Sequence, residues 1–162
     1  MFIYSVRGST VKLCALVLLL AVLIGVVALS GQGEVVSAVS SATEIDYSGI
    51  KTKEDRAGFI KNFGIEIDES AEESVAFRMP DNFDRVLLGY NELQKKQGLD
   101  ILKYKNKKVT RYTYKVTNYD CDGDVYANLF VYRGRIVACD LTNAEHGGFV
   151  IPLTLVERSK LK

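Results

Sequence analysis

The longest unbroken run of apolar residues lies close to the N-terminus. Residues 13–29, LCALVLLLAVLIGVVAL, contain no charged side chain, and they are preceded by Arg7 and Lys12 with no acidic residue before them. Such a run is near the lower limit for crossing a hydrocarbon core of about 30 Å as a helix. Cations on its N-terminal side favour a cytoplasmic N-terminus. The pattern predicts a cytoplasmic segment at 1–12, a single-pass transmembrane signal-anchor at 13–30 and an extracytoplasmic remainder attached to the cell membrane.

A cleaved secretory signal is the alternative interpretation of this run, because Ala28 and Ser30 are small residues of the kind that signal peptidase prefers. We favour the anchor, since the run is longer than the apolar core of an ordinary signal peptide. The next segment, GQGEVVSAVSSATEIDYSG, shows no sustained period and predicts a flexible linker at 31–49. An extracytoplasmic domain is expected at 50–156, with a C-terminal tail at 157–162.

Two segments of the domain show the apolar spacing of helices. Thr52 and Asp55 have the spacing of a capping box ahead of a short helix that Gly64 ends. Asp81 is expected to cap a second helix that ends before Gly98. The apolar face of this second helix is expected to comprise Phe83, Val86, Leu87, Tyr90 and Leu93.

The second half of the chain is rich in β-branched and aromatic residues. The segments LDILKY, KKVTRYTYKVTN, DVYANLFVY and RIVACDL are separated by turn residues at Asn106, Gly123 and Gly134. They predict an antiparallel four-stranded meander. GIEID and SVAFRMP, on either side of an acidic turn, predict a short additional β-hairpin. The expected fold class is α+β, with two helices packed on one face of the meander after the N-terminal transmembrane helix.

The segments YNELQKKQGLDILKYKNKKVTRYTYKVTNY, ANLFVYRGRIVACD and GGFVIP resemble a family of uncharacterised bacterial extracytoplasmic domains, the domain of unknown function numbered forty-eight thirty. The likeness covers roughly residues 50–153. It implies a bacterial protein, and the family's N-terminal membrane segment agrees with the predicted anchor. It implies no activity and no catalytic residue. The cysteines at 121 and 139 are expected to be particular to this chain, so the resemblance implies no shared cysteine chemistry.

Charge excludes one class of partner. The chain has 21 Lys and Arg against 20 Asp and Glu, a formal net charge of +1. Without an overall basic field, nucleic acid is not expected as a partner. The distribution is uneven, however: the segment 66–73 is an acidic block without a base, whereas 95–115 is strongly basic.

The stretch YDCDGDVYANLF contains three aspartates at alternate positions, Asp120, Asp122 and Asp124. Their spacing matches the start of an EF-hand calcium loop. Val125 stands where that loop needs glycine, and Val131 stands where it needs a bidentate glutamate. We therefore expect a solvated turn, with no metal site and no cofactor.

Cysteine chemistry leaves two alternatives open. Cys121 and Cys139 form a disulfide if the domain faces an oxidising exterior and the loop folds back far enough, and otherwise remain two separate thiols. A cysteine nucleophile needs a base, and His146 is the only histidine. Nothing in the sequence supplies a group to orient that histidine, so no catalytic residue is predicted.

Strand register determines which side chains share a face of the meander. We expect Asn118 to pair with Val125 and Tyr132 with Arg135. The core face would then comprise Tyr112, Tyr114, Val116, Ala127, Leu129, Val131, Ile136 and Ala138. The outer face would comprise Arg111, Thr113, Lys115, Tyr126, Asn128, Phe130, Tyr132, Arg135 and Val137, with no acidic residue.

Aromatic and cationic side chains of this kind dominate binding hot spots. The predicted ligand-binding residues are Arg111, Lys115, Tyr126, Phe130, Tyr132 and Arg135. Two structural alternatives stay open: the segment GGFVIPLTLV or the first helix covers this face, or the acidic block 66–73 docks on its cations.

These features favour a membrane-tethered, extracytoplasmic binding domain that catalyses nothing. The expected partners are the membrane, through the N-terminal helix, and an anionic envelope component or an acidic protein. The alternatives are an extracytoplasmic hydrolytic enzyme, using Cys139 with His146 or an unidentified carboxylate pair, and a structural subunit of an envelope complex.

Overall fold

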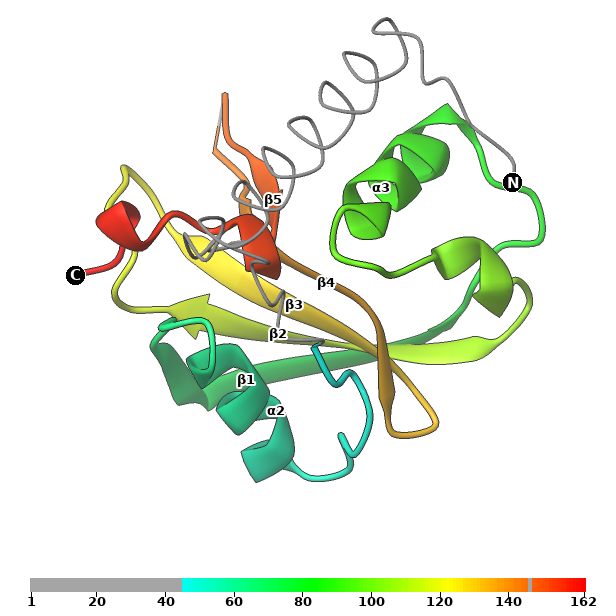
Figure 1. Cartoon of the computed structure of the whole chain (residues 1–162), viewed down its shortest axis with the longest axis horizontal. Coiled ribbons are helices and arrows are strands. Elements are labelled where there is room, and N and C mark those ends of the chain that lie inside the picture. Colours follow the sequence, from blue (N-terminus) through cyan, green and yellow to red (C-terminus); the bar gives the residue numbers. More distant parts are fainter. Residues whose placement is uncertain (1–44, 146) are drawn as a thin grey trace, which may run out of the picture. The chain divides into compact units, whose positions relative to one another are not determined.

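The computed structural model describes residues 45–145 and 147–162. Its centre is a five-stranded antiparallel sheet in which strands adjacent in sequence are adjacent in space (Figure 1). The strands are β1 (Ile67–Arg78), β2 (Lys108–Val116), β3 (Val125–Tyr132), β4 (Arg135–Asn143) and β5 (Val150–Pro152). The helices are α2 (Lys53–Lys61) and α3 (Arg85–Lys95), and three short 3₁₀ helices follow them in the chain: η1 (Ile101–Tyr104), η2 (Leu153–Leu155) and η3 (Arg158–Lys160). The α+β class is confirmed.

The composition of the sheet differs from the predicted four strands and separate hairpin. The end of GIEID and most of SVAFRMP belong to one long strand, β1, which accommodates the acidic residues through a register irregularity between Asp68 and Glu73. LDILKY forms η1 instead of a strand, because the Asp100 side chain caps the amide of Leu102. The C-terminal segment adds β5 to the sheet.

The two helix starts illustrate how local signals succeed and fail. The capping box at Thr52 and Asp55 is present as predicted. The cap of α3 is Asp84, not Asp81, and its side chain accepts a hydrogen bond from the Leu87 amide. Val86, in the first turn of this helix, is 78% exposed and therefore lies outside the buried core that its spacing predicted.

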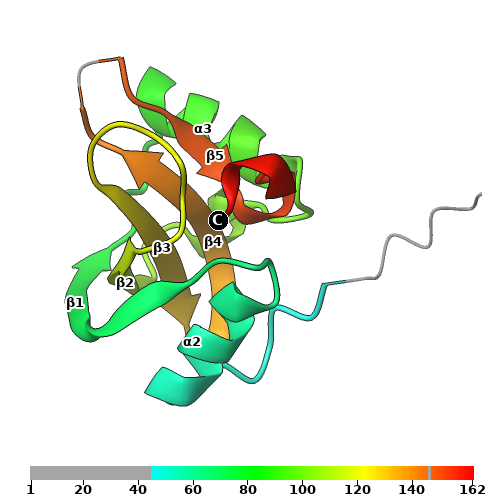
Figure 2. The ribbon, with the colours of Figure 1, turned by 90° about the vertical axis from the view of Figure 1, so that its left-hand side faces the viewer.

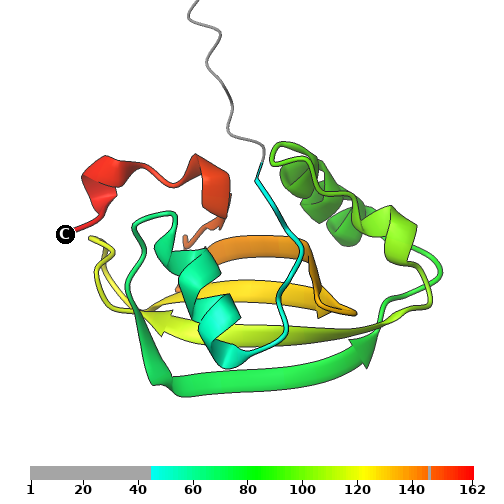
Figure 3. The same ribbon diagram turned by 60° about the horizontal axis from the view of Figure 1, so that its bottom comes forward.

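The helices contact opposite faces of the sheet, whereas a single covered face was expected. α2 lies across the face that carries Tyr114 (Figure 3), where Arg56 donates a hydrogen bond to the Tyr114 hydroxyl at 2.9 Å. α3 reaches the other face through Tyr90, whose ring lies 6.0 Å from that of Phe130. Because side chains alternate along a strand, Phe130 and Leu129 point to opposite sides of β3.

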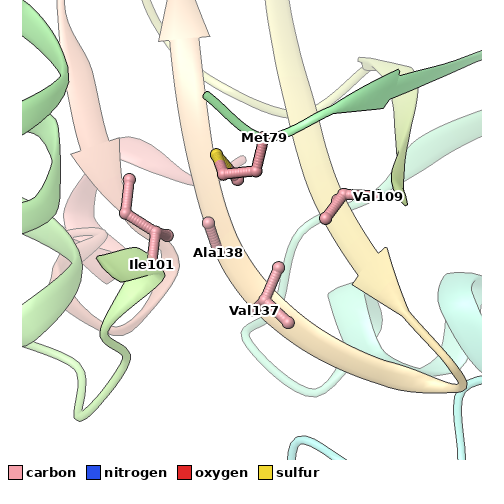
Figure 4. Close-up of a cluster of buried hydrophobic side chains, with 5 residues drawn as sticks. All are labelled: Met79, Ile101, Val109, Val137 and Ala138. Carbon is pink, nitrogen blue, oxygen red and sulfur yellow. The ribbon is translucent and has the colours of Figure 1, made fainter. Parts of the chain in front are cut away.

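Each face consequently has its own buried cluster. On the α2 side the fully buried side chains include Ile60, Tyr114, Leu129, Ile136 and Leu141. On the α3 side, part of the outer face is covered by a second cluster, Met79, Ile101, Val109, Val137 and Ala138 (Figure 4). Phe77, Phe83, Leu87, Tyr104 and Tyr132 pack against that second cluster.

The hairpin between β3 and β4 contains the detail that shapes the outer face. Arg133 and Gly134 both have positive φ, as a two-residue turn of this type requires, and Tyr132 pairs with Arg135 as predicted. A bulge then shifts the register, so that Phe130 faces Ala138 and Asn128 faces Asp140. One extra residue in β4 therefore exchanges the faces of its later side chains.

The register between β2 and β3 also differs from the expected one. Lys115 pairs with Tyr126, whereas the predicted pairing of Asn118 with Val125 would have placed Lys115 opposite Asn128, so the register is shifted by two residues. The Asn118 side chain instead bonds the Glu66 amide and the Gly64 carbonyl. A register shift of two residues leaves every side chain on the same face of the sheet, so the predicted faces of β2 and β3 are retained.

Side-chain amides hold α3 at the outer edge of β4, next to β5 (Figure 2). Gln94 Oε1 accepts a hydrogen bond from the Cys139 amide at 3.0 Å, and Gln94 Nε2 donates to the Cys139 carbonyl at 3.2 Å. Gln97 Nε2 donates to the same carbonyl at 2.7 Å. These bonds replace a strand partner and position Tyr90 over the sheet.

In the part of the chain that the structure describes, no helix has the length and apolar character needed to cross a membrane. The predicted cytoplasmic segment at 1–12, the anchor at 13–30 and most of the linker at 31–49 lie outside the described residues.

Candidate functional site

A cleft of about 480 Å³ opens on the outer face of the sheet, between α3 and β5. We call it the polar cleft. It is lined by Glu73, Tyr90, Arg111, Thr113, Tyr126, Asn128, Phe130, Asp140, Thr142, Ala144 and Val150. Strands β1 to β4 supply the floor, Tyr90 supplies the α3 wall and Val150 supplies the β5 wall. Tyr90 and Phe130 also separate it from an apolar cleft of about 390 Å³ beside Met79.

The centre of the floor is the carboxylate of Asp140, which is 2% exposed. Its Oδ1 accepts hydrogen bonds from Asn128 Nδ2 at 2.8 Å and from the Thr142 hydroxyl at 2.7 Å. Its Oδ2 accepts a hydrogen bond from the Tyr90 hydroxyl. Thr113 extends this network by donating to Asn128 Oδ1 at 2.9 Å.

Burial controls the ionisation of the tyrosine in this network. Burial, together with the negative charge of Asp140, raises the pKa of Tyr90 well above its usual value of 10.0, and Arg111 opposes this shift. A protonated phenol can donate a hydrogen bond to a carboxylate, whereas a phenolate cannot. Tyr90 therefore remains a hydrogen-bond donor to Asp140 throughout the physiological pH range.

The open side of the polar cleft carries opposite charges. Arg111 lies across from Val75 on β1, and Glu73 lies one diagonal step away, across from Thr113. Both charged side chains are exposed. Arg111 forms no ion pair within residues 45–145 and 147–162.

The structure brings three of the six predicted ligand-binding residues into the polar cleft, namely Arg111, Tyr126 and Phe130. The other three lie outside it. Lys115 pairs with Asp124 at 2.7 Å, and the Tyr132 ring packs against Tyr104. Arg135 is exposed at the start of β4.

The expectation of an acid-free outer face is wrong, because Asp140 and Glu73 both line the polar cleft. The bulge turns Asp140 outward, and β1 places Glu73 beside Thr113. The proposed covers also differ: α2 lies on the opposite face, and the C-terminal segment pairs with the edge of β4. Two other residues of the acidic block pair elsewhere, Glu72 with Arg56 and Glu69 with Lys61.

Cys121 and Cys139 occupy unlike environments. Cys139 is fully buried on β4, and burial raises the pKa of its thiol strongly. Cys121 is exposed in the loop before β3, where its sulfur lies 3.5 Å from Asn143 Nδ2. Both thiols are free in the structure, so the disulfide stays a prediction. A neutral, buried Cys139 thiol is a poor nucleophile, and the side chain of His146 lies outside the described residues.

The three alternating aspartates do not converge on one point. Asp120 pairs with Lys162 at 2.6 Å and Asp124 pairs with Lys115. Over the described residues, no group of three or more His, Cys, Asp or Glu side chains has an arrangement that suits a metal ion.

A family model matches residues 59–141, about half of the chain, and its description is a domain of unknown function, DUF4830. The chain belongs to the DUF4830 family. The match confirms the resemblance noted from the sequence, and it runs from α2 through most of β4. The DUF4830 region therefore contains Glu73, Tyr90, Arg111 and Asp140, whereas β5 lies beyond it. No curated protein and no solved structure matches the chain.

Sequence reasoning did not identify the acidic residues of the polar cleft. Asn128 and Thr113 were placed on the correct face, but Asp140 was not assigned to it. The signal was weak because Ile136, Val137, Ala138 and Cys139 are all small or apolar and show no alternation that would reveal a bulge. Tyr90 was expected on a helix face, without any indication that it would meet Asp140.

Proposed function

We propose that this protein is a membrane-tethered, extracytoplasmic binding domain of a bacterial cell and that it catalyses no reaction. Segment 13–30 would hold it in the membrane, and its ligand would lie in the polar cleft. The observation that carries this proposal is the gathering of Arg111, Tyr126 and Phe130 around one concave site. A concave site with aromatic walls and a few convergent polar groups is typical of ligand binding.

The exposed guanidinium of Arg111 indicates that the proposed ligand carries an anionic group. It is exposed at the cleft and forms no ion pair in the described part of the chain, so its guanidinium is available to a phosphate or carboxylate. An anionic envelope component or an acidic protein would satisfy it. Lys115 and Arg135 then contribute less, because Lys115 already pairs with Asp124 and neither lines the cleft.

Binding is tested with the full-length protein in lipid nanodiscs and with anionic polymer isolated from the cell envelope. We expect Arg111→Glu to weaken capture about tenfold and to reduce its dependence on salt, since the lost contact is electrostatic. Arg158→Glu is the matched control, because it makes the same charge change at an exposed position outside the cleft. Equal capture by both variants would reject Arg111 as the binding group.

Topology is tested on intact cells. Protease added outside should remove the C-terminal domain and leave the anchor in the membrane fraction. Protection of the C-terminal domain would reverse the proposed orientation. A mature N-terminus near residue 31 would replace the anchor by a cleaved signal.

A hydrolytic enzyme is the second candidate, and one observation favours it. Glu73 and Asp140 line the same cleft, and glycoside hydrolysis uses two carboxyl groups on either side of the scissile bond. Incubation of envelope polysaccharide with the wild-type protein and with Glu73→Gln separates the two functions. Release of reducing ends that Glu73→Gln abolishes would establish an enzyme, whereas retained binding without release supports the binding domain.

The structural-subunit alternative makes a different prediction. A subunit of an envelope complex would bury the outer face of the sheet against another protein. Detergent-solubilised native membranes would then contain the protein only in a large assembly, and Arg111→Glu would release it from that assembly without affecting polymer capture.

A further inference from the structure

The floor of the polar cleft has used all the side-chain donors of its hydrogen-bond network. Both N–H groups of Asn128 are occupied, one by Asp140 Oδ1 at 2.8 Å and one by Thr142 Oγ1 at 3.2 Å. The hydroxyls of Thr113, Thr142 and Tyr90 donate within the same network. The groups of this network that remain available, the Asp140 carboxylate and the threonine oxygens, can only accept hydrogen bonds. A ligand group that contacts this network must therefore donate them.

The charge of the floor narrows the type of donor. The carboxylate of Asp140 is buried and is bonded only by the neutral side chains of Asn128, Thr142 and Tyr90. It forms no ion pair with any residue in the described ranges. A buried charge without a counter-charge is costly. Glu73 adds a second carboxylate to the lining, so a positively charged donor is favoured over a neutral hydroxyl.

The walls suit a cation as well. Tyr90, Tyr126 and Phe130 line the cleft around Asp140, and the negative face of an aromatic ring attracts an ammonium group. A metal ion fits less well, because Asp140 Oδ1 already accepts two hydrogen bonds and the described residues supply no cluster of three ligating side chains. An ammonium group needs only acceptors and aromatic faces, and both are present.

We propose that the polar cleft binds an ammonium group, with Asp140 on its floor, the aromatic rings of Tyr90, Tyr126 and Phe130 around it, and the carboxylate of Glu73 at the open side. This rests on the proposed function, in which Arg111 binds an anionic group of the same ligand. The ligand is therefore zwitterionic, with its ammonium group inward on Asp140 and its phosphate or carboxylate outward on Arg111. Amine-bearing anionic polymers and phosphoethanolamine headgroups share this chemistry.

The test compares two small probes that differ at one group. Phosphoethanolamine carries a phosphate and an ammonium group, whereas glycerol phosphate carries the phosphate with hydroxyls in place of the ammonium. Titration into the full-length protein in uncharged maltoside detergent micelles should show about tenfold tighter binding of phosphoethanolamine, a preference of the size expected for one charge pair with cation–π contacts. Equal affinities, or binding of neither probe, would overturn the ammonium site.

Variants connect the preference to the floor. Glu73 is exposed, so the Glu73→Gln variant should fold. We expect this variant to reduce the preference for phosphoethanolamine several-fold and to leave the affinity for glycerol phosphate unchanged or slightly increased. Asp140→Asn should abolish the preference, with folding checked by circular dichroism. Glu157→Gln is the matched control, since it removes an exposed carboxylate outside the cleft. A preference that survives Glu73→Gln and a folded Asp140→Asn would also overturn the proposal.

Different results would contradict the proposed binding domain and the proposed ammonium site. If Arg111→Glu weakens capture of the envelope polymer but the probes show no ammonium preference, the binding domain stands and the ammonium site falls. If Arg111→Glu has no effect on polymer capture and neither probe binds, both fall. The source of the ligand is distinguished by competition, because a polymer and a phosphoethanolamine lipid vesicle should each displace the small probe only if they supply the bound group.

Discussion

Tyr90 on α3 donates a hydrogen bond to Asp140 on β4, with 2.5 Å between the two oxygens. The residues are 50 positions apart in the sequence, and this bond joins the helix that covers part of the outer face to the floor of the polar cleft. It also places the Tyr90 ring beside Phe130. The bond consequently connects the stability of α3 with the geometry of the proposed site.

Replacing Tyr90 by Phe should destabilise the protein. The change removes one donor to a buried carboxylate, and a hydrogen bond to a charged group contributes about 1.5–3 kcal/mol. Urea unfolding followed by circular dichroism measures the loss. Tyr126→Phe is the control, because the Tyr126 hydroxyl makes no hydrogen bond within the described ranges and its removal should change stability by less than about 0.5 kcal/mol. Similar stabilities for the two variants would show that the Tyr90 bond contributes little.

Stability should fall at alkaline pH because several phenols are held in their protonated form. Burial raises the pKa of Tyr90, Tyr47 and Tyr114 above 10.0, the usual value at which they ionise in the unfolded chain. Their contribution is complete below pH 10 and is lost as the pH rises from there toward the folded-state values. Unfolding free energies measured from pH 8 to 11 should decline above pH 10, and the decline should be shallower in Tyr90→Phe. A flat profile would contradict the raised pKa values.

The glutamine pair at the edge of β4 should be essential for docking α3. Gln94 is fully buried, and its amide bonds both the amide and the carbonyl of Cys139. Gln94→Ala leaves the Cys139 amide without its partner and opens a cavity, so we expect a loss of about 2–4 kcal/mol. Lys96→Ala, at an exposed position of the same segment, should stay within about 0.5 kcal/mol.

Hydrogen exchange provides the local readout for the same variant. Opening of α3 in Gln94→Ala should accelerate exchange at α3 and at Cys139 more than at β2, which lies far from the edge. Uniform acceleration across the sheet would indicate global destabilisation and would argue against a specific docking role.

Cys121 and Cys139 should react very differently with an alkylating reagent. Exposed Cys121 should be modified in the native protein, whereas buried Cys139, whose thiol pKa is raised by burial, should react only after unfolding. Mass spectrometry of native and denatured samples, without reduction, counts the modified sites. If neither cysteine reacts until a reductant is added, the predicted disulfide is present and the exposed thiol is not.

Sequence alone determined the features that depend on neighbours along the chain. The capping box at Thr52 and Asp55, the two-residue turn at Arg133 and Gly134, and the alternation along β2 and β3 all follow from local backbone preferences and side-chain period. Membership of the DUF4830 family also follows from residue order, without any coordinates. These features identified the α+β class and placed Arg111, Tyr126 and Phe130 on one face.

Tertiary structure decided which groups meet those three residues. The bulge that turns Asp140 to the outer face depends on how β4 pairs with β3, since the apolar residues from Ile136 to Cys139 carry no alternation of their own. The position of Tyr90 depends on Gln94 and Gln97 docking on the edge of β4, more than 40 residues away in sequence. Glu73 reaches the cleft because β1 pairs with β2 across a long connection. Strand partners and helix docking are decided by the packing of the whole core. The outer face is therefore a cleft of mixed charge, where the sequence had predicted a cationic surface.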